Sequence, residues 1–258
     1  MKTDTKIRLI QIIETNGPAR PVDLTRLLGI SSQAVHRQLR ALVSDGVLES
    51  RGSPPATFYA LAGMPDFSKA FEWLSAARLS KNPASHVCET RDVFTARLSS
   101  LRTLVKQGLP TEDLPLLISV VGEIGNNSFD HNLGQWRDVP GCWYEIQVTR
   151  NLLWVIIADR GQGIFNSLAK MNAGISNGQA AIEIAFEKFV SGRAPEQRGN
   201  GLKYVKKAIV IENGRGLACV SGAGRICFGD QGGSCDKILK KDLGKLKGTA
   251  TLLVWGLK

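Results

Sequence analysis

Four polar residues in the middle of the chain share the spacing of one helix face. They stand at positions i, i+4, i+7 and i+8 of an otherwise apolar segment: Glu123, Asn127, Asp130 and His131. This spacing places their side chains on one side of an α-helix. A carboxylate and an amide there can hold Mg²⁺ and orient a water molecule, because Mg²⁺ prefers oxygen ligands. A polar stripe that faces solvent has the same spacing, so the pattern alone leaves both interpretations open.

A second group follows an apolar run, 152–158, that has the composition of a buried strand. It consists of one acid and two glycines: Asp159, Gly161 and Gly163. An aspartate at such a strand end is partly dehydrated and can accept a hydrogen bond from an adenine amino group. Glycines lack a Cβ, so a flat base can lie against their backbone. A tight turn before a helix uses the same residue types, and that alternative stays open.

A third group opens a helical pattern. Its members are Gly199, Gly201 and Leu202. A Gly-x-Gly loop before a helix exposes backbone N–H groups at the positive end of the helix dipole, and phosphate groups bind there. The chain contains neither a Walker A sequence nor Gly-x-Gly-x-x-Gly, so P-loop and Rossmann sites are not supported.

In this order the three groups resemble the motifs of the GHKL ATPases, the family of gyrase, Hsp, histidine-kinase and mismatch-repair ATPase domains. The resemblance covers residues 110–258. The matched motifs are an N box at Glu123, Asn127 and His131; a first glycine box at Asp159, Gly161 and Gly163; an F box at Phe186 and Phe189; a second glycine box at Gly199, Gly201 and Leu202; and a closing Gly248-Thr249.

The resemblance implies a role for each matched residue. Asn127 would ligate Mg²⁺, and Glu123 would be the general base that activates a water or a hydroxyl group. Asp159 would select adenine, and Thr249 would support it through water. The glycines that would shape the phosphate lid are Gly199 and Gly201. The nucleotide-binding set is completed by Asp130, His131, Gly161, Gly163 and Leu202.

The implied cofactors are ATP and Mg²⁺. The implied fold is α+β, an α/β sandwich in which a mixed sheet of the Bergerat type is backed by helices. One departure concerns the second glycine box, which is short and lacks a longer glycine run. This departure leaves lid closure and ATP turnover open. Before the last strand, lysines cluster in residues 237–247; they form either a solvated face or a contact with nucleic acid or an acidic partner.

The first 62 residues show a different pattern: helix, short helix, turn, helix and hairpin. Apolar residues recur at helical spacing in 4–14 and again after Pro21, and Ser31 is a good N-cap for the third helix. Two strand-like segments, 47–52 and 58–61, flank a Gly-Ser-Pro-Pro tip. This order resembles the winged-helix bacterial regulators.

DNA is the partner that we expect for this segment. The outer face of the third helix would read base edges or hold phosphates, and an arginine of the wing would meet an adjacent phosphate. The residues concerned are Ser32, Gln33, His36, Arg37, Arg40 and Arg51. Winged helices also dock on proteins or dimerise, so a protein-binding role is the alternative.

These patterns divide the chain into three parts. We predict a winged helix-turn-helix domain at residues 1–62, a helical connector at 63–109 and an ATP-binding domain at 110–258. The connector would contain one helix near residues 67–74 and a longer one over about 85–107. Glycine-rich hairpins and an insertion would follow residue 213 and precede the final strand.

Composition restricts the protein class. The chain has 258 residues and a formal net charge of +10, an excess that favours a polyanionic partner. No apolar run approaches the ~20 residues of a membrane span, and the N-terminus lacks the apolar core of a signal peptide. The five cysteines are scattered without a Cys-x-x-Cys pair, so neither a disulfide framework nor a zinc site is expected. We therefore expect a cytoplasmic protein without a membrane partner.

Two functions fit this sequence. In the first, the chain is a DNA-binding regulator whose nucleotide state controls how it meets DNA or a protein partner. In the second, it is an ATPase or a protein kinase acting on a partner protein, similar to the stand-alone kinase-like anti-sigma factors. A self-phosphorylating histidine kinase is disfavoured, because the sequence offers no suitable acceptor histidine. The expected partners are ATP or ADP, DNA, a protein partner and a second copy of the chain, since winged-helix proteins commonly form homodimers.

Overall fold

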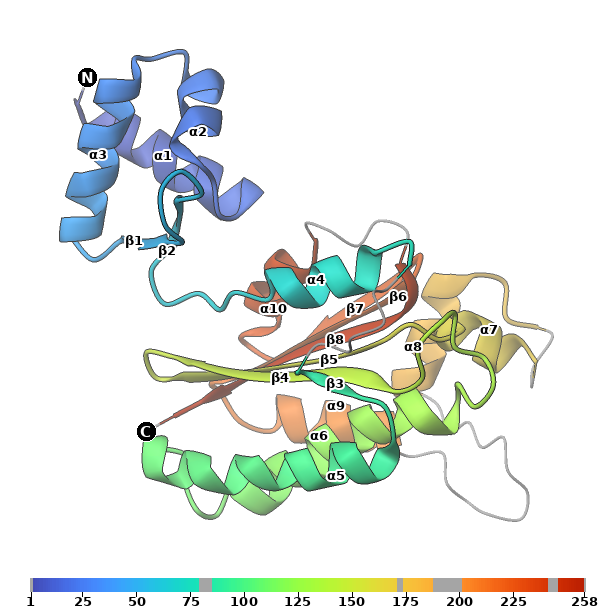
Figure 1. Ribbon diagram of the computed structural model, residues 1–258. Coiled ribbons are helices and arrows are strands. Elements are labelled where there is room, and N and C mark those ends of the chain that lie inside the picture. Colours follow the sequence, from blue (N-terminus) through green and yellow to red (C-terminus); the bar gives the residue numbers. More distant parts are fainter. Residues whose placement is uncertain (1, 79–84, 171–173, 188–200, 241–245, 258) are drawn as a thin grey trace. The chain divides into compact units, whose positions relative to one another are not determined.

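The computed structural model describes residues 2–78, 85–170, 174–187, 201–240 and 246–257. The chain divides into two compact units, Met1–Met64 and Pro65–Lys258 (Figure 1). Among the described residues, no helix has both the length and the apolar character that crossing a membrane requires.

The first unit has the predicted order of elements. Helices α1 (Lys2–Asn16), α2 (Pro21–Leu28) and α3 (Ser32–Ser44) precede the antiparallel strands β1 (Leu48–Arg51) and β2 (Phe58–Leu61). Ala19 extends this hairpin, because its N–H donates to the Tyr59 carbonyl at 3.0 Å and its carbonyl accepts from the Tyr59 N–H at 2.9 Å.

Local signals and burial together fix the third helix. The Ser31 hydroxyl accepts a hydrogen bond from the Ala34 N–H at 3.3 Å and caps the first turn of α3. One face of α3 then carries the buried residues Val35, Leu39 and Leu42, which join the core of the unit. Because this face is buried, the opposite face of α3 is turned to solvent.

A six-stranded sheet forms the centre of the second unit. Its spatial order is β3 (Val87–Cys88), β4 (Cys142–Thr149), β5 (Leu152–Asp159), β8 (Leu246–Gly256), β6 (Arg215–Gly222) and β7 (Gly224–Phe228). Every described pairing is antiparallel, so the prediction of a mixed sheet is wrong. The reason is the connectivity: β4–β5 and β6–β7 are hairpins, and β8 enters between β5 and β6, antiparallel to both.

Helices cover both faces of this sheet (Figure 1). Helices α4 (Ser68–Ser75) and α10 (Gly232–Lys240) lie on one face, and α5 (Arg91–Leu98), α6 (Leu114–Asp130) and α9 (Gly201–Val210) lie on the other. The central strands are therefore buried on both sides. In β5, for example, Trp154 joins the core beneath α4, and Val155 joins the core beneath α6.

Two remaining helices, α7 (Gly163–Ala169) and α8 (Gly178–Glu187), pack on each other through Leu168 and Ala181. One sequence-based expectation fails in this unit. The helix predicted over 85–107 is instead strand β3, helix α5 and a 3₁₀ segment, Ser99–Gln107. Helix α5 begins after β3 because the Thr90 hydroxyl accepts a hydrogen bond from the Val93 N–H at 3.3 Å.

Candidate functional site

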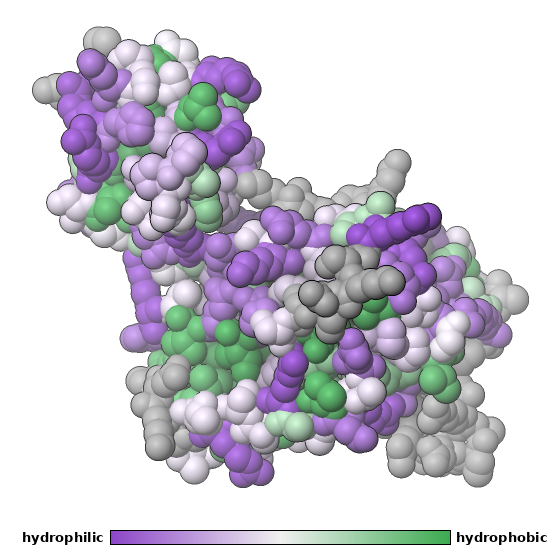
Figure 2. Space-filling view, in the orientation of Figure 1, coloured by the Kyte–Doolittle hydropathy of each residue, from purple (hydrophilic) through white to green (hydrophobic). Residues whose placement is uncertain are grey.

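The outer face of α3 is a continuous polar surface. Its residues are exposed and line one shallow concavity: Ser32, Gln33, His36, Arg37 and Arg40. Figure 2 shows hydrophilic side chains along this side of the first unit. A helix that presents Arg, Gln and Ser in this way offers hydrogen-bond donors to base edges and to phosphates.

Arg51 is placed differently from the other residues expected to contact DNA. Its guanidinium forms an ion pair with Glu49, with the Nε–Oε1 distance at 2.8 Å, and it also donates to the Met64 carbonyl. The side chain is 18% exposed and does not line the concavity on α3. In this arrangement the guanidinium binds within its own unit.

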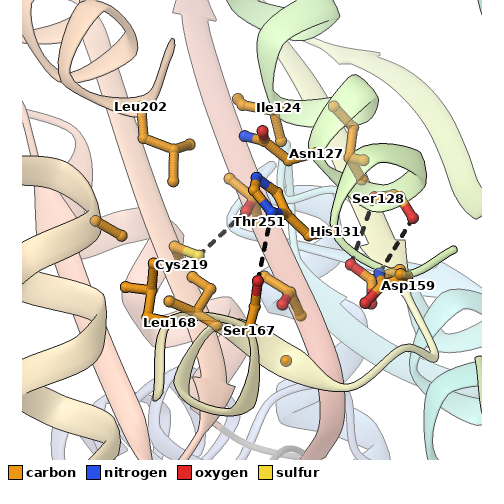
Figure 3. Close-up of a pocket in the computed structure, with 16 residues that line it drawn as sticks. Ile124, Asn127, Ser128, His131, Asp159, Ser167, Leu168, Leu202, Cys219 and Thr251 are labelled. Carbon is orange, nitrogen blue, oxygen red and sulfur yellow. Dashed lines mark hydrogen bonds between the residues drawn. The ribbon is translucent and has the colours of Figure 1, made fainter. Parts of the chain in front are cut away.

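The second unit contains a cavity between α6, α7, α8, α9 and the ends of three central strands (Figure 3). Apolar side chains form much of its wall: Ile124, Ile157, Ile164, Leu168, Ala185 and Leu202. Its polar lining includes residues that the sequence singled out, from three separate segments: Asn127, His131, Asp159 and Thr249. Residues more than 100 positions apart in the chain therefore meet at one cavity.

Asp159 supplies a buried carboxylate to this cavity. The residue is 4% exposed. Its Oδ1 accepts a hydrogen bond from the Gly161 N–H at 2.9 Å, and its Oδ2 accepts one from the Ser128 hydroxyl at 3.4 Å. Burial disfavours the charged form and raises the pKa of Asp159 to about 6, because the hydrogen bonds that favour the charge offset only part of this effect. The cavity therefore holds a hydrogen-bond acceptor whose charge is poorly hydrated.

The two glycines after Asp159 meet two different backbone demands. A Cβ on Gly161 would lie 2.1 Å from the Asn132 side chain, so only glycine allows this approach. Gly163 has a φ of +79°, in the left-handed region that favours glycine, and it lines the cavity at the start of α7. Gly161 thus allows the turn after β5 to lie close to the end of α6, and Gly163 lies against Ser221 and Gly248 of the sheet.

Some of the expected site residues lie outside the cavity lining. Glu123 is exposed on α6, and its carboxylate lies against the backbone of Gly201, where an added Cβ would be 2.3 Å from Oε2. Asp130 forms an ion pair with Arg91 on α5 and does not line the cavity. Gly199 lies outside the described residues.

Comparison with known protein families identifies part of the chain. Residues 2–49 match the family described as winged helix-turn-helix DNA-binding. This segment is a winged helix-turn-helix DNA-binding domain. The match indicates DNA as its partner, and the roles of the individual α3 side chains stay predictions. The comparisons give no support to the ATPase resemblance of the second unit, and no curated protein matches the chain.

Beyond the winged-helix domain, sequence reasoning missed several polar residues of the cavity. These are Ser128, Asn132, Ser167, Cys219 and Thr251. Two signals could have found some of them: Ser128 and Asn132 directly follow predicted residues on α6, and Thr251 follows Thr249 at the period of a strand. Ser167 comes from the packing of α7, where its hydroxyl lies 3.3 Å from His131 Nδ1 (Figure 3).

No metal cage accompanies the cavity in the part of the chain that the structure describes, because no group of three or more His, Cys, Asp or Glu side chains could hold an ion there. The Asn127 side chain at the cavity offers an amide oxygen as a metal ligand. Such a donor suits Mg²⁺ held mainly by ligand phosphates and water rather than by protein side chains.

Proposed function

We propose that this chain is an adenine-nucleotide-binding regulator in which the nucleotide state controls the interaction of the winged-helix domain with DNA. The observation that carries the proposal is Asp159, a buried carboxylate on an otherwise largely apolar cavity wall. A flat heteroaromatic ring fits apolar walls, and its exocyclic amine would satisfy a carboxylate that water does not reach.

Hydrogen bonding at Asp159 suits the amino group of adenine. Asp159 only accepts hydrogen bonds when it is ionised, and the amino group of adenine can donate to it. Guanine in the same orientation would present a carbonyl oxygen instead, and two acceptors facing each other in a buried site leave both unsatisfied. Guanine would have to turn its N1–H and 2-amino group toward the carboxylate in order to bind. Thr249, the register partner of Asp159 on β8, and Ser128 add hydroxyl groups beside the carboxylate.

The proposal also includes a place for Mg²⁺ and the phosphate groups of the nucleotide. Asn127 would contribute an oxygen ligand to Mg²⁺, which would neutralise phosphate charge. Helix α9 begins at Gly201 and brings Leu202 to the cavity, so the positive end of its dipole would favour phosphate near the same place.

A second candidate function is ATP turnover, as an ATPase or a kinase acting on a protein partner. One observation favours it: the Glu123 carboxylate lies beside Gly201 at the start of α9, next to the proposed phosphate position. Glu123 would there act as a general base toward an attacking water or hydroxyl group.

Calorimetric titration of the full-length protein with ATP, ADP and GTP in the presence of Mg²⁺ tests the proposal. We expect ATP and ADP to bind, and GTP to bind at least about tenfold more weakly. Asp159→Asn should weaken ATP binding by about 10- to 100-fold, the range for a lost hydrogen bond to a charged group. The absence of heat with both adenine nucleotides would contradict the proposal.

Glu72→Gln is the matched control, since it removes one carboxylate charge at an exposed position on α4 and should leave ATP affinity unchanged. Phosphate release measured in the same samples separates the two functions. Release that is abolished by Glu123→Ala supports turnover, whereas binding without release supports a nucleotide switch.

A further inference from the structure

Two cysteines face each other at the edge of the central sheet. In the antiparallel pairing of β3 with β4, Cys88 is the register partner of Cys142. Both side chains are fully buried, in the core that lies beneath α5 and α6. Directly opposite residues on antiparallel strands point to the same face of the sheet, so the two sulfur atoms are neighbours.

The spacing of this pair suits a covalent bond. The Tyr144 N–H donates to the His86 carbonyl at 2.9 Å, and hydrogen-bonded and non-hydrogen-bonded pairs alternate along an antiparallel ladder. Two positions further along, Cys88 and Cys142 therefore form a hydrogen-bonded pair, for which the Cα atoms are about 5.5 Å apart. Disulfides join Cα atoms roughly 4.4–6.8 Å apart, so a hydrogen-bonded pair has a Cα separation that a disulfide can span.

The surroundings also favour reaction at Cys88. Its sulfur is within hydrogen-bonding reach of the Cys142 thiol, and the Arg97 guanidinium of α5 lies near it. The hydrogen bond and the positive charge both lower the pKa of the Cys88 thiol. The hydrogen bond with Cys88, together with burial, raises the pKa of the Cys142 thiol. Cys88 is therefore the thiol of the pair that loses its proton more readily, and Cys142 is the one that retains it.

We propose that Cys88 and Cys142 are a peroxide-sensitive dithiol that closes to a disulfide across β3 and β4. The Cys88 thiolate attacks one oxygen of hydrogen peroxide, the O–O bond breaks, and a sulfenic acid and hydroxide form. The Cys142 sulfur then attacks the Cys88 sulfur, and the departing hydroxide leaves as water with the Cys142 proton. In sum, two thiols and one peroxide become one disulfide and two waters, and the two thiols lose two electrons to peroxide.

The position of the bond gives it a structural consequence. Strand β3 has two residues and lies at the sheet edge, where short elements open locally at low free-energy cost and admit a small oxidant. The bond would fix this edge strand to β4. Cys142 is also the register partner of Asp159 on β5, so the modification would sit beside the carboxylate of the cavity. The inference itself does not depend on what the cavity binds.

Peptide mapping of the full-length reduced protein tests it. After treatment with hydrogen peroxide, free thiols are alkylated in denaturant and the unreduced digest is analysed by mass spectrometry. We expect one pair of peptides joined through Cys88 and Cys142, which separates on reduction with dithiothreitol. Cys227, the exposed cysteine, serves as the reference for oxidant dose.

Two variants sharpen the result. Cys227→Ser should retain the linked peptides, and Cys88→Ser should lose them. The oxidised wild-type protein should also unfold at a midpoint roughly 5 °C or more above that of the reduced protein, because the bond closes a long loop, and Cys88→Ser should lack this shift. Alkylation of Cys88 and Cys142 at a dose that oxidises Cys227 overturns the proposal, as does linkage of Cys88 to any other cysteine. The wild-type map decides the question even if a variant fails to fold.

Discussion

At the scale of single residues, Asp159 combines its proposed role in nucleotide binding with a cost to folding. Its carboxylate is buried, and its pKa is raised from 3.8 to about 6. A carboxyl group whose folded-state pKa lies above the unfolded value favours the folded state when it is protonated. That contribution is fully present below about pH 4 and is lost as pH rises through about 6. At neutral pH the protein thus maintains a charge that weakens its own fold, as binding sites often do.

Removal of the Asp159 charge should therefore stabilise the folded protein at neutral pH. Asp159→Asn keeps the shape of the side chain, an acceptor for the Gly161 N–H and a polar partner for the Ser128 hydroxyl. The variant has no charge to bury, so its free energy of unfolding relative to wild type should rise between pH 4 and pH 7. A shift of about two pKa units corresponds to an increase of about 3 kcal/mol at most.

Urea unfolding of both proteins at several pH values measures this difference. The remaining titrating groups are shared, so they cancel in the comparison. A stability difference that stays flat from pH 4 to pH 7 would show that the carboxylate is not held in an apolar environment. Together with the loss of ATP affinity expected above, a more stable Asn variant would separate a binding defect from a folding defect.

At the scale of elements, helix α6 depends on close contact with α5. Gly125 lies on the buried side of α6, and a Cβ there would be 2.0 Å from the Phe94 ring. The ring cannot move away freely, because it is 1% exposed and packs edge-on against Tyr144 with the centroids 5.4 Å apart. The absence of a side chain at Gly125 therefore sets how near the cavity helix approaches its neighbour.

Gly125→Ala should destabilise the second unit by about 1–3 kcal/mol, the range for an extra methyl group in a packed core. The control is Gly233→Ala on α10, where an added Cβ meets no atom within 4 Å; it should be neutral or stabilise the helix by up to about 1 kcal/mol. Tryptophan fluorescence during urea unfolding reports on the second unit alone, because all five tryptophans follow residue 64. Equal stability of the two variants would rule out the close contact.

The elements also show how far the sequence predicts this fold. Capping and periodicity are local, so Ser31 and the apolar face of α3 predict the recognition helix, and the apolar run before Asp159 predicts β5. Strand β3 has only two residues and shows no period. Helix α10 begins with Gly232-Gly233-Ser234, which are poor helix formers, and it forms because Cys235 and Leu239 are buried against the sheet.

The cavity follows the same division. Asn127 and His131 could be predicted from the sequence because they share one helix face, and Asp159 could be predicted because it ends a strand. The antiparallel order of the sheet could not be predicted from the sequence, since β8 pairs with strands from distant parts of the chain and no local pattern encodes this pairing. Cys219 reaches the cavity through this strand register and Ser167 through the packing of α7, and so local motifs could not reveal these two residues.

At the scale of the whole molecule, the cavity and the start of the second unit are joined by one buried side chain. Arg160 directly follows Asp159 and is fully buried. Its guanidinium pairs with Asp138, and it donates to the carbonyls of Leu74 at 3.1 Å and Ala76 at 2.8 Å. These carbonyls lie at the C-terminal end of α4, the first helix after the domain boundary at Met64. Arg160 therefore connects the turn after Asp159 through hydrogen bonds to the first helix that follows the winged-helix domain.

This connection leads to a prediction about coupling. A ligand shifts DNA binding only through a difference in its affinity for two states of the protein, and such couplings typically amount to about 5- to 150-fold. We expect saturating ATP and Mg²⁺ to change the affinity for a labelled duplex, selected by the protein from random sequences, by at least about fivefold. Fluorescence anisotropy at fixed salt concentration measures the effect. By linkage, the same duplex must change ATP affinity in calorimetry by the same factor.

Two variants test the two coupled sites, the nucleotide cavity and the DNA-binding helix, separately. Asp159→Asn should bind the duplex as wild type does without nucleotide but should not respond to ATP. The double variant Arg37→Ala, Arg40→Ala should bind the duplex more weakly with and without ATP, and the slope of log affinity against log salt should fall by about one for each phosphate contact removed. If ATP binds and the DNA affinity of the wild type stays constant, the nucleotide does not control the winged-helix domain. Unequal factors in the two directions would mean that the anisotropy change reports something other than a linked equilibrium, such as aggregation on the duplex.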